Sequence, residues 1–353
     1  MSDRLIGYSV FLFILLLSAC KSPPSPIVTK SEYITTFSGE AMTMKYKIIV
    51  GHPLENTSSQ QISDLIMETF NEVDRIYNKW NPNSELSQLN KQKADIKTPL
   101  SPALHRLLKE TDAIVLLSEG RFDPTIEPLQ QLWYKHAQNG SIPNDAEIDA
   151  IAPAIGWNNI HFDESGFHKD HDLTQMDLGG IAKGLCIDLF IERLKDLSYR
   201  NCYVEWGGEI RASGQHPEGR PWTIFISALS NENPDEAIDT LYLNDHAIAT
   251  SGDYLQNWSI KLPDENGKHS IVTYFHIFDP KTLKPLEASH ESIASASILA
   301  ESCAMADGIA TAVMLFGNVA EAEEWLQRVQ KQFPGISYWL SSRKIMKNQR
   351  YTL

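Results

Sequence analysis

Cysteine is scarce in this sequence, and its spacing argues against two common uses of the residue. The 353 residues contain four cysteines, Cys20, Cys186, Cys202 and Cys303, and no pair has the C-x-x-C spacing. The pattern indicates neither a disulfide framework nor a zinc site built on cysteine. Cys186 lies within an apolar pattern of helical spacing, so we expect a small core residue there rather than a nucleophile.

Positive charge is also in short supply. Lysine and arginine total 31 against 45 aspartate and glutamate residues, which gives a formal net charge of −14. Nucleic-acid binding usually requires basic surface patches, so the excess of acidic residues argues against a nucleic-acid partner. An anionic ligand would need local help from a lysine such as Lys183, from main-chain N–H groups or from a metal ion.

Long hydrophobic runs are limited to one short stretch near the N-terminus. Val10–Leu17 follows Arg4 and is shorter than the roughly 20 residues that span a bilayer, so it predicts a signal sequence. The tetrapeptide Leu17-Ser18-Ala19-Cys20 is typical of bacterial lipoproteins. We therefore expect residues 1–19 to be a signal peptide, Cys20 to be lipidated and residues 20–36 to form a flexible tether. The alternative is an ordinary secretory cleavage that happens to precede a cysteine.

The expected lipid anchor also predicts where the protein resides. Several acyl chains on one residue make membrane attachment stable, so the protein should be anchored to a membrane of the bacterial cell envelope and face the periplasm or the exterior. Residues 37–353 contain no second hydrophobic span and no internal repeat. We expect them to form a single domain.

Helical and strand-like patterns are mixed along this domain. Helical patterns fall at 62–77, from Ser101-Pro102 to Gly120, and at 180–197, 302–316 and 319–333, and strand-like runs fall at 42–50, 202–206, 222–226, 247–250, 272–278 and 293–299. Ser101-Pro102 and Gly120 are the expected start and stop signals of the second helix. Because helices and strands do not alternate strictly, the pattern favours an α+β fold with a mixed or antiparallel sheet over a doubly wound parallel sheet.

The most informative motif is Met176–Gly184, M-D-L-G-G-I-A-K-G, at an expected strand-to-helix turn. Such a turn presents free main-chain N–H groups and the positive end of a helix to an anion, and Lys183 adds a point charge. Asp177 in the same turn suits a ring N–H, a hydroxyl or a metal ion better than another phosphate. The motif predicts a nucleotide or pyrophosphate site, although glycine-rich turns before helices are often only caps.

Two further clusters carry candidate chemistry. Asp307 and Thr311 are four residues apart and therefore share one helical face, where a carboxylate and a hydroxyl offer the oxygen ligands that magnesium prefers. The alternative is a helix-start aspartate and a threonine bonded back into its own helix. His276 ends a strand-like run before Asp279-Pro280 and could serve as a base or a phosphate donor, although a lone histidine is more often a structural core residue.

These segments, taken in order, resemble the FAD:protein FMN transferase (ApbE) family. The resemblance covers about residues 37–335 and rests on the motifs S-E-L-S-x-L-N, G-x-F-D-P-T, D-L-G-G-I-A-K-G, G-G-E-I-R-A-S-G with G-R-P-W, T-S-G-D-Y, H-I-F-D-P-K-T and A-D-G-I-A-T-A. It implies a T-fold-like α+β core that holds FAD, with magnesium on its pyrophosphate. It also implies transfer of FMN to a Ser or Thr hydroxyl of a target protein, with release of AMP.

The resemblance assigns roles to particular residues. Asp177 and Lys183 would hold FAD, and His276 would stand near the reacting phosphate as the first candidate for the base, with Asp279 as the alternative. Magnesium would be bound by the main-chain carbonyl of Gly180 together with Asp307, which also counts as catalytic, and Thr311. The flavin site would be lined by Met42, Trp80, Phe122, Asp123, Pro124 and Ile277.

The chain departs from the family pattern in its first strand. The family usually has Met-Gly-Thr there, whereas this chain has Met42-Thr43-Met44, which places the local flavin contact in question. Trp80 also replaces a more usual tyrosine. Two rival functions remain: a hydrolase that cleaves FAD to FMN and AMP, and a flavin-holding lipoprotein without turnover. The presence of both Asp307 and Thr311 argues against the second.

Overall fold

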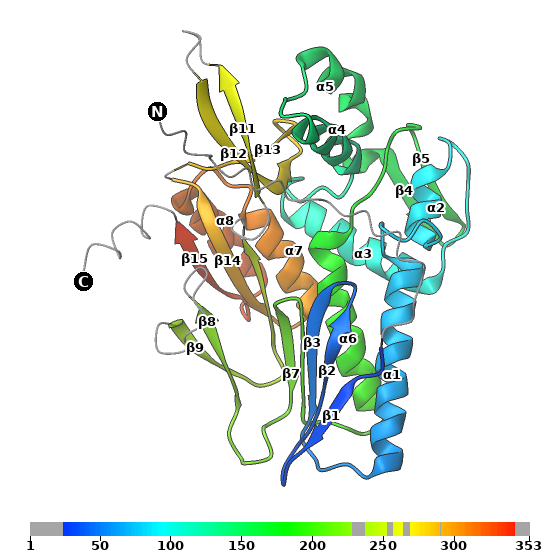
Figure 1. Ribbon diagram of the computed structural model, residues 1–353, viewed down its shortest axis with the longest axis vertical. Coiled ribbons are helices and arrows are strands. Elements are labelled where there is room, and N and C mark those ends of the chain that lie inside the picture. Colours follow the sequence, from blue (N-terminus) through cyan, green and yellow to red (C-terminus); the bar gives the residue numbers. More distant parts are fainter. Residues whose placement is uncertain (1–23, 228–236, 253–256, 264–268, 290, 343–353) are drawn as a thin grey trace, which may run out of the picture.

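An eight-stranded antiparallel sheet forms the centre of the protein (Figure 1). The computed structural model describes residues 24–227, 237–252, 257–263, 269–289 and 291–342. The strand order is β1-β2-β3-β6-β7-β10-β14-β15. The strands are β1 (Ile27–Lys30), β2 (Thr35–Ala41), β3 (Met44–Val50), β6 (Cys202–Trp206), β7 (Glu209–Ser213), β10 (Ala247–Gly252), β14 (Ile293–Ala300) and β15 (Ser337–Ser342).

Two helices from distant parts of the chain pack together on this sheet. Helix α6 (Gly179–Asp196) and helix α7 (Cys303–Val313) lie side by side, α6 against β6 and β7 and α7 against β10 and β14 (Figure 1). Outside them, α1 (Asn56–Ile76) packs on α6, and α3 (Pro102–Leu117) packs on both. The remaining helices are α2 (Glu85–Lys91), α4 (Glu127–Gln138), α5 (Asp145–Ile151), α8 (Val319–Gln332) and the short 3-10 helices η1 (Ala152–Ala154) and η2 (Trp157–Asn159).

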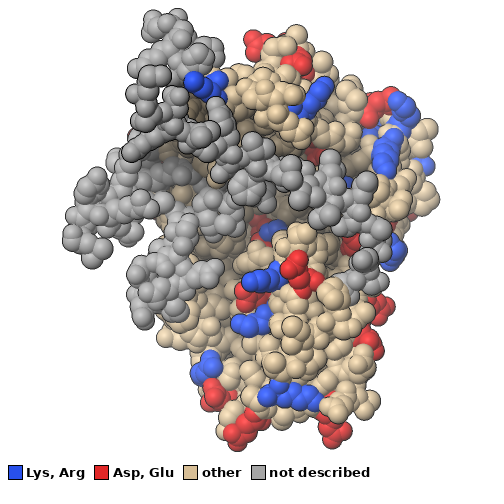
Figure 2. Space-filling model, in the orientation of Figure 1, with Lys and Arg blue, Asp and Glu red and all other residues tan. Residues whose placement is uncertain are grey.

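Within the described residues, three smaller sheets surround the central one. They are β11 (Asn257–Pro263), β12 (His269–Asp279) and β13 (Lys284–Glu287); the hairpin β4 (Ile160–Asp163) and β5 (Gly166–Lys169); and the hairpin β8 (Trp222–Ser227) and β9 (Ala237–Leu243). The three-stranded sheet packs on α4 through a separate aromatic core that includes Trp133, Tyr274 and Phe278. Basic and acidic side chains are interspersed on the face shown in Figure 2.

Local sequence explains why the principal elements form. The side chain of Ser101 caps α3 by accepting a hydrogen bond from the Leu104 N–H, and Pro102 occupies the first turn. Gly120, which follows the helix, has a φ of +72°, as expected for a glycine that ends a helix. Strand β14 is buried along almost its whole length because α7 covers one face of the sheet at this point. Its sequence is accordingly apolar and small rather than alternating.

The structure confirms the α+β prediction and places an element at each of the helical and strand-like runs, with one local difference. The run at 42–50 was expected to be strand throughout, but β3 begins at Met44. Met42 and Thr43 form the two-residue turn between β2 and β3, with φ values of +48° and +66°. Two positive φ values are typical of the turn that matches the twist of a hairpin, a position where glycine is the easier residue.

The N-terminal boundary also differs from the sequence expectation. Ile27–Lys30 already pairs with β2 as strand β1, so the sheet begins before residue 37, inside the segment assigned to the tether. The predicted signal peptide and Cys20 lie outside the described residues. Among the residues that are described, no helix has the length and apolar character needed to cross a membrane.

Candidate active site

The glycine-rich turn lies at the N-terminus of α6, as the motif predicts, but the expected strand before it is absent: β5 ends at Lys169, and only an isolated bridge at Gln175 precedes the turn. Helix α6 begins at Gly179, and its N-cap residue, Leu178, makes no side-chain hydrogen bond to the helix. The Asp177 carboxylate accepts a hydrogen bond from the Gly179 N–H at 2.8 Å, while the Asp177 N–H donates to the Pro124 carbonyl at 2.7 Å. The second contact joins the turn that contains Phe122 and Pro124 to the start of α6. Two segments predicted separately to bind flavin are therefore adjacent.

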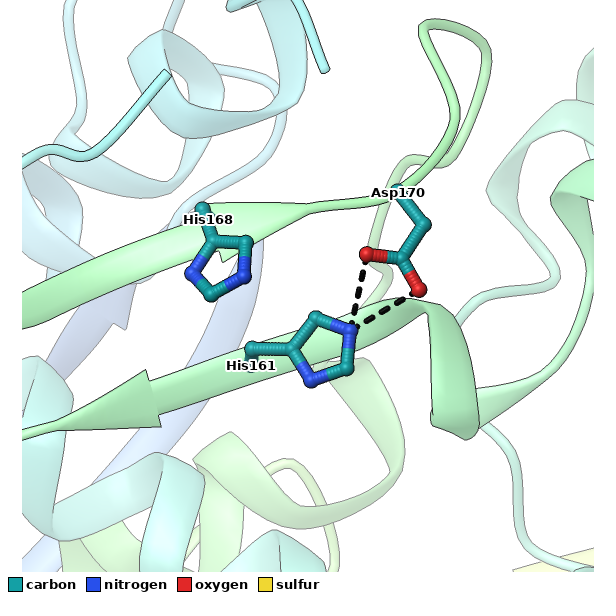
Figure 3. Close-up of side chains that lie close together, drawn as sticks. All are labelled: His161, His168 and Asp170. Atoms are coloured by element: carbon teal, nitrogen blue, oxygen red, sulfur yellow. Dashed lines mark hydrogen bonds and ion pairs between the residues drawn. The ribbon is translucent and has the colours of Figure 1, made fainter. Parts of the chain in front are cut away.

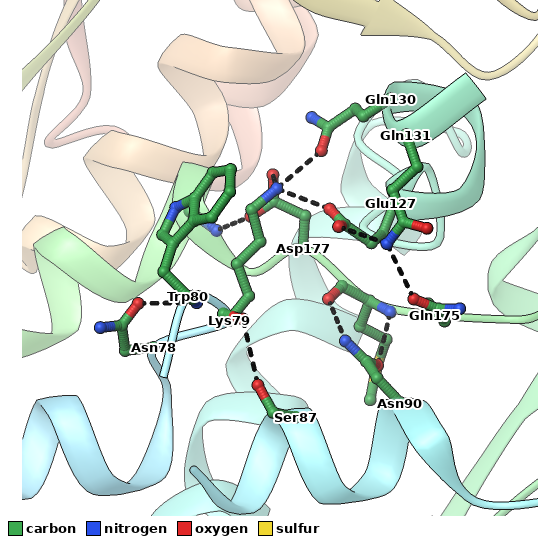
Figure 4. A network of polar contacts seen from close by, with 12 residues as sticks. Asn78, Lys79, Trp80, Ser87, Asn90, Glu127, Gln130, Gln131, Gln175 and Asp177 are labelled. Atoms are coloured by element: carbon green, nitrogen blue, oxygen red, sulfur yellow. Dashed lines mark hydrogen bonds and ion pairs between the residues drawn. The ribbon is translucent and has the colours of Figure 1, made fainter. Parts of the chain in front are cut away.

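A half-buried lysine, Lys79, organises the acidic side of this turn (Figure 4). Lys79 Nζ lies 2.9 Å from Asp177 Oδ2, 2.5 Å from Glu127 Oε2 and 2.8 Å from the side-chain oxygen of Gln130. Although burial opposes it, the Asp177 and Glu127 carboxylates raise the pKa of Lys79 above its ordinary value. Burial likewise opposes ionisation of Asp177, but the Lys79 ammonium lowers the pKa of that carboxyl. Asp177 is thus held as a carboxylate.

A second buried charge cluster joins α6 to α7 and β7. Lys183 forms an ion pair with Glu209, and its Nζ lies 3.7 Å from Asp307 Oδ1. The Glu209 and Asp307 side chains are only 1% and 2% exposed. Burial, with help from the Asp307 charge, raises the pKa of Glu209 to about 7 although Lys183 opposes the shift, and burial also raises the pKa of Asp307. One lysine thus faces two carboxylates that are both poorly solvated.

Gly180 and Thr311, one from each of the two predicted ligand segments, lie in contact. The Thr311 hydroxyl lies 3.5 Å from the Gly180 carbonyl oxygen and 3.2 Å from the Ser251 hydroxyl. A Cβ atom on Gly180 would lie 3.0 Å from both the Phe122 ring and the Thr311 hydroxyl, so only glycine fits without displacement. On the neighbouring turn of α7, Asp307 accepts a hydrogen bond from the Gly184 N–H at 3.1 Å. Asp307 and Thr311 therefore both face α6.

The other predicted flavin residues have different surroundings. Trp80 is 71% exposed, with Lys79 Nζ 4.9 Å from its ring centroid, so it is not a core residue. The Asp123 carboxylate accepts hydrogen bonds from the Thr125 N–H and hydroxyl and from the Trp157 N–H. Asp123 therefore stabilises the turn that contains Phe122 and Pro124. Met42 lies in the β2–β3 turn, whose next residue, Met44, packs beside Gly207.

His276 and Ile277 lie in strand β12 of the three-stranded sheet. His276 is half-buried, and Ile277 is buried in the main core. Asp279, the alternative base, uses both carboxylate oxygens in its own turn, where it accepts from the Lys281 N–H and the Thr282 hydroxyl. This agrees with the turn role that its Asp-Pro context favoured.

The structure adds residues to the site that the sequence reasoning did not select. They are Lys79, Glu127, Gln130, Glu209 and Ser251. Glu209 and Ser251 lie within the motifs G-G-E-I-R and T-S-G-D-Y, so the signal was present without an assigned role. Lys79 directly precedes Trp80, and in this segment the sequence suggested a role only for the aromatic ring of Trp80. Its importance depends on a contact 98 residues along the chain, with Asp177.

Comparison with known proteins defines the class to which this fold and site belong. The model of the ApbE family matches residues 42–336, and the chain belongs to that family. Among curated relatives, the FAD:protein FMN transferase of Chlamydia pneumoniae is 39% identical over 319 residues, which cover 90% of this chain and 93% of the relative. The protein of the same name from Vibrio cholerae is 31% identical and covers 88% of this chain and 89% of its own length.

Solved structures agree with the family assignment. The apo form of the flavinyl transferase ApbE from Pseudomonas stutzeri superposes with a TM-score of 0.74 at 25% identity and covers 88% of this chain and 91% of its own. The flavin transferase ApbE from Vibrio cholerae gives a TM-score of 0.69 at 27% identity, with coverage of 90% and 99%. The predicted ApbE-like fold is therefore confirmed.

Proposed function

We propose that this chain transfers FMN from FAD to a serine or threonine hydroxyl of a target protein and releases AMP. The observation that carries the proposal is the meeting of α6 and α7: Gly180 lies against Thr311, and Lys183 lies beside Asp307. The residues expected to hold the nucleotide and those expected to hold a metal ion thus share one location. Membership of the ApbE family and the names of the relatives support the same transferase activity.

FAD binding is assigned to the start of α6 and its neighbours. The N-terminus of α6, whose N-cap residue Leu178 makes no side-chain hydrogen bond, offers a positive helix end to the pyrophosphate, beside Lys183. The exposed ring of Trp80 offers a flat apolar surface to a heterocycle, whereas the ring of Phe122 is buried and packs against Gly180 as part of the core that supports this turn. Asp177, kept ionised by Lys79, would accept a hydrogen bond from a ring N–H or hydroxyl of the ligand.

The residues at the α6–α7 contact fit a hard divalent cation such as Mg²⁺. The carbonyl of Gly180, the hydroxyl of Thr311 and the carboxylate of Asp307 are all oxygen donors. The local charge also fits, because one lysine faces two buried carboxylates and Glu209 Oε2 has no hydrogen-bond partner among the described residues. Mg²⁺ bound there would neutralise negative charge on the pyrophosphate and on the AMP leaving group.

The chain's own residues then provide position and proton transfer. The acceptor hydroxyl oxygen forms a bond to the FMN phosphorus, the bond from that phosphorus to the bridging oxygen breaks, and AMP departs with the electron pair. A threonine hydroxyl is a weak nucleophile, so a base within hydrogen-bond reach should take its proton. His276 remains the first candidate, because the turn that follows it already uses both oxygens of Asp279. In-line placement of the hydroxyl supplies much of the remaining rate.

The direct test is covalent flavin transfer in a purified system. The protein is incubated with FAD, Mg²⁺ and an acceptor protein that bears a reactive threonine, and flavin fluorescence is read on a denaturing gel. Asp307→Ala should abolish the fluorescent band, whereas Asp149→Ala, an exposed helical aspartate, should not change it. A wild-type enzyme that releases FMN and AMP without labelling any acceptor would support the hydrolase instead.

We also propose that Cys20 anchors the protein to a membrane of the bacterial envelope. The support is the Leu17–Cys20 sequence after a short hydrophobic run. Cys20→Ala should move the protein from the detergent phase to the aqueous phase in detergent partitioning. Recovery of the variant in the detergent phase to the same extent as the wild type would refute the anchor.

A further inference from the structure

A second cluster of metal-ligating side chains lies outside the proposed active site, on the β4–β5 hairpin (Figure 3). His161 and His168 are directly opposite each other in the antiparallel register of the two strands. Asp170 comes directly after β5, two residues beyond His168, and its carboxylate lies beside the His161 ring (Figure 3). One donor atom from each of the three residues lies within 4.8 Å of the others. Two imidazoles and one carboxylate thus converge from two strands.

The distances within this cluster suit a single metal ion. His161 Nε2 lies 2.8 Å from Asp170 Oδ1 and 2.9 Å from Oδ2, and the rings of His161 and His168 stack with centroids 4.7 Å apart. Donors that share one tetrahedral zinc at about 2.0–2.1 Å lie about 3.3 Å from each other. To share one ion, His161 and Asp170 must separate slightly, the other donor atoms, which lie within 4.8 Å, must come closer, and the stacked His161 and His168 rings must turn so that their nitrogens face the ion. Within the described residues the His168 ring nitrogens make no hydrogen bond, so they are available as donors.

The strand that carries two of the three donors is fixed from beneath. Lys169, between His168 and Asp170, is 1% exposed, and its Nζ donates to the carbonyls of Asn90, Asp172 and Thr174. The Asp170 N–H donates to the Asn159 carbonyl at 3.0 Å. A main chain held in this way sets the direction of the ligand side chains before any ion arrives, which limits the entropy lost on binding.

We propose that His161, His168 and Asp170 bind a late first-row divalent transition ion, Zn²⁺ being the best match. Imidazole nitrogen with one carboxylate oxygen is the donor set of zinc, copper and nickel rather than of magnesium. The two histidines also line a surface depression of about 460 Å³. This leaves the fourth coordination position open to water or to a further ligand. The site shares no residue with the α6–α7 cluster, so it is separate from the proposed transfer reaction.

The test is the stoichiometry and affinity of Zn²⁺ binding, measured by isothermal titration on the full chain in excess Mg²⁺. The double variant His161→Ala/His168→Ala should bind one zinc fewer than the wild type. Asp170→Asn, which keeps the side-chain shape, should lower the affinity for Zn²⁺ by about tenfold or more. His52→Ala removes an exposed histidine elsewhere and serves as the matched control, which should bind zinc like the wild type.

A spectroscopic readout makes the result independent of folding and of activity. Co²⁺ in place of Zn²⁺ should give the intense visible absorption of a tetrahedral ion in the wild type and in His52→Ala, and should lose it in the double variant. Circular dichroism reports whether each variant remains folded. Equal zinc stoichiometry and equal cobalt spectra in the wild type and in folded Asp170→Asn and double-variant proteins would overturn the proposal.

Discussion

Gly184 of α6 lies directly against the main chain of Cys303, the first residue of α7. A Cβ atom on Gly184 would be 2.3 Å from the Cys303 carbonyl oxygen, closer than any real contact allows. The same interface is fastened by Asp188, whose two carboxylate oxygens accept hydrogen bonds from the Cys303 and Ala304 N–H groups at 2.9 Å each. The spacing of α6 and α7 is therefore set by backbone contact. That spacing determines how far Lys183 stands from Asp307.

Gly184→Ala should separate the two helices and reduce both stability and transfer. The obstructing atom is main-chain oxygen and cannot rotate away, so we expect a loss of about 1–3 kcal/mol or more in unfolding free energy, as for overpacked cores. Gly317→Ala is the matched control, because its Cβ would meet nothing closer than 3.6 Å and a compatible Gly→Ala change alters stability by at most about 1 kcal/mol. Urea unfolding of the two variants compares them. Equal urea midpoints for Gly184→Ala and Gly317→Ala would show that the α6–α7 interface accommodates the added methyl group without loss of stability.

The sequence predicts the elements of this interface but not their contact. The apolar pattern at 180–197 and the Asp307-Thr311 spacing each indicate one face of one helix. Neither pattern shows that the two faces meet. Their contact depends on strands β7, β10 and β14, which bring residues 123 positions apart, such as Gly184 and Asp307, next to each other. The contact between the two helices was implied only by the family resemblance, and the two helices are in contact in the structure.

Long-range charge partners are harder still to predict. Lys79, Glu127 and Asp177 come from three separate segments, and the sequence around each residue gives no indication that it contacts the other two. At Thr43, by contrast, the unusual feature can be read directly from the sequence, because threonine stands where the family usually has glycine. The structure gives its consequence as a φ of +66° on a β-branched residue, which is a conformation that costs energy.

Removal of the Lys79 charge should destabilise the FAD turn. Lys79→Met would leave the Asp177 and Glu127 carboxylates buried without their cation, and the loss of one partner of a buried pair costs about 3–5 kcal/mol. Lys93→Met removes a lysine that pairs with Asp172 at 2.9 Å on the surface, where solvent screening leaves the pair little net effect on stability. Thermal unfolding of both variants measures the contrast. FAD titration should show weaker binding in Lys79→Met alone, and similar losses in both variants would contradict the buried role.

The stability of the ion-free protein should depend on Glu209 between about pH 4.5 and pH 7. Burial raises the pKa of Glu209 to about 7 from the ordinary 4.5. In this window the unfolded chain has already lost the Glu209 proton while the folded protein keeps it. Because the folded state then binds more protons, its stability falls as the pH rises and levels off above pH 7. Glu209→Gln cannot titrate and should lack this component.

Melting temperatures of the wild type and Glu209→Gln, measured in EDTA from pH 4.5 to 8, isolate the effect. The wild type should lose stability relative to the variant across the window. Parallel curves would mean that Glu209 is ionised throughout. Added Mg²⁺ should stabilise the wild type more at pH 8 than at pH 5, since a cation competes with the protons on these carboxylates.

Transfer should depend on Mg²⁺ through two residues of unequal weight. Asp307 contributes a buried charge, so Asp307→Ala should abolish transfer. Thr311 contributes a neutral hydroxyl that lies 3.5 Å from the Gly180 carbonyl oxygen, so Thr311→Ala should be milder and partly rescued by excess Mg²⁺. Thr311→Ser keeps the hydroxyl and is the matched control, with activity near that of the wild type. Ca²⁺, which is larger and less exacting in geometry, should support transfer poorly.

The measurement for this prediction is flavin fluorescence on the acceptor, followed against Mg²⁺ concentration for each variant with and without EDTA. A metal-binding role predicts that Thr311→Ala shifts the Mg²⁺ dependence to higher concentration. A purely structural role predicts a lower yield at every Mg²⁺ concentration, with the midpoint unchanged. Full activity in EDTA, or in Asp307→Ala, would show that the assignment of Gly180, Asp307 and Thr311 to magnesium is wrong.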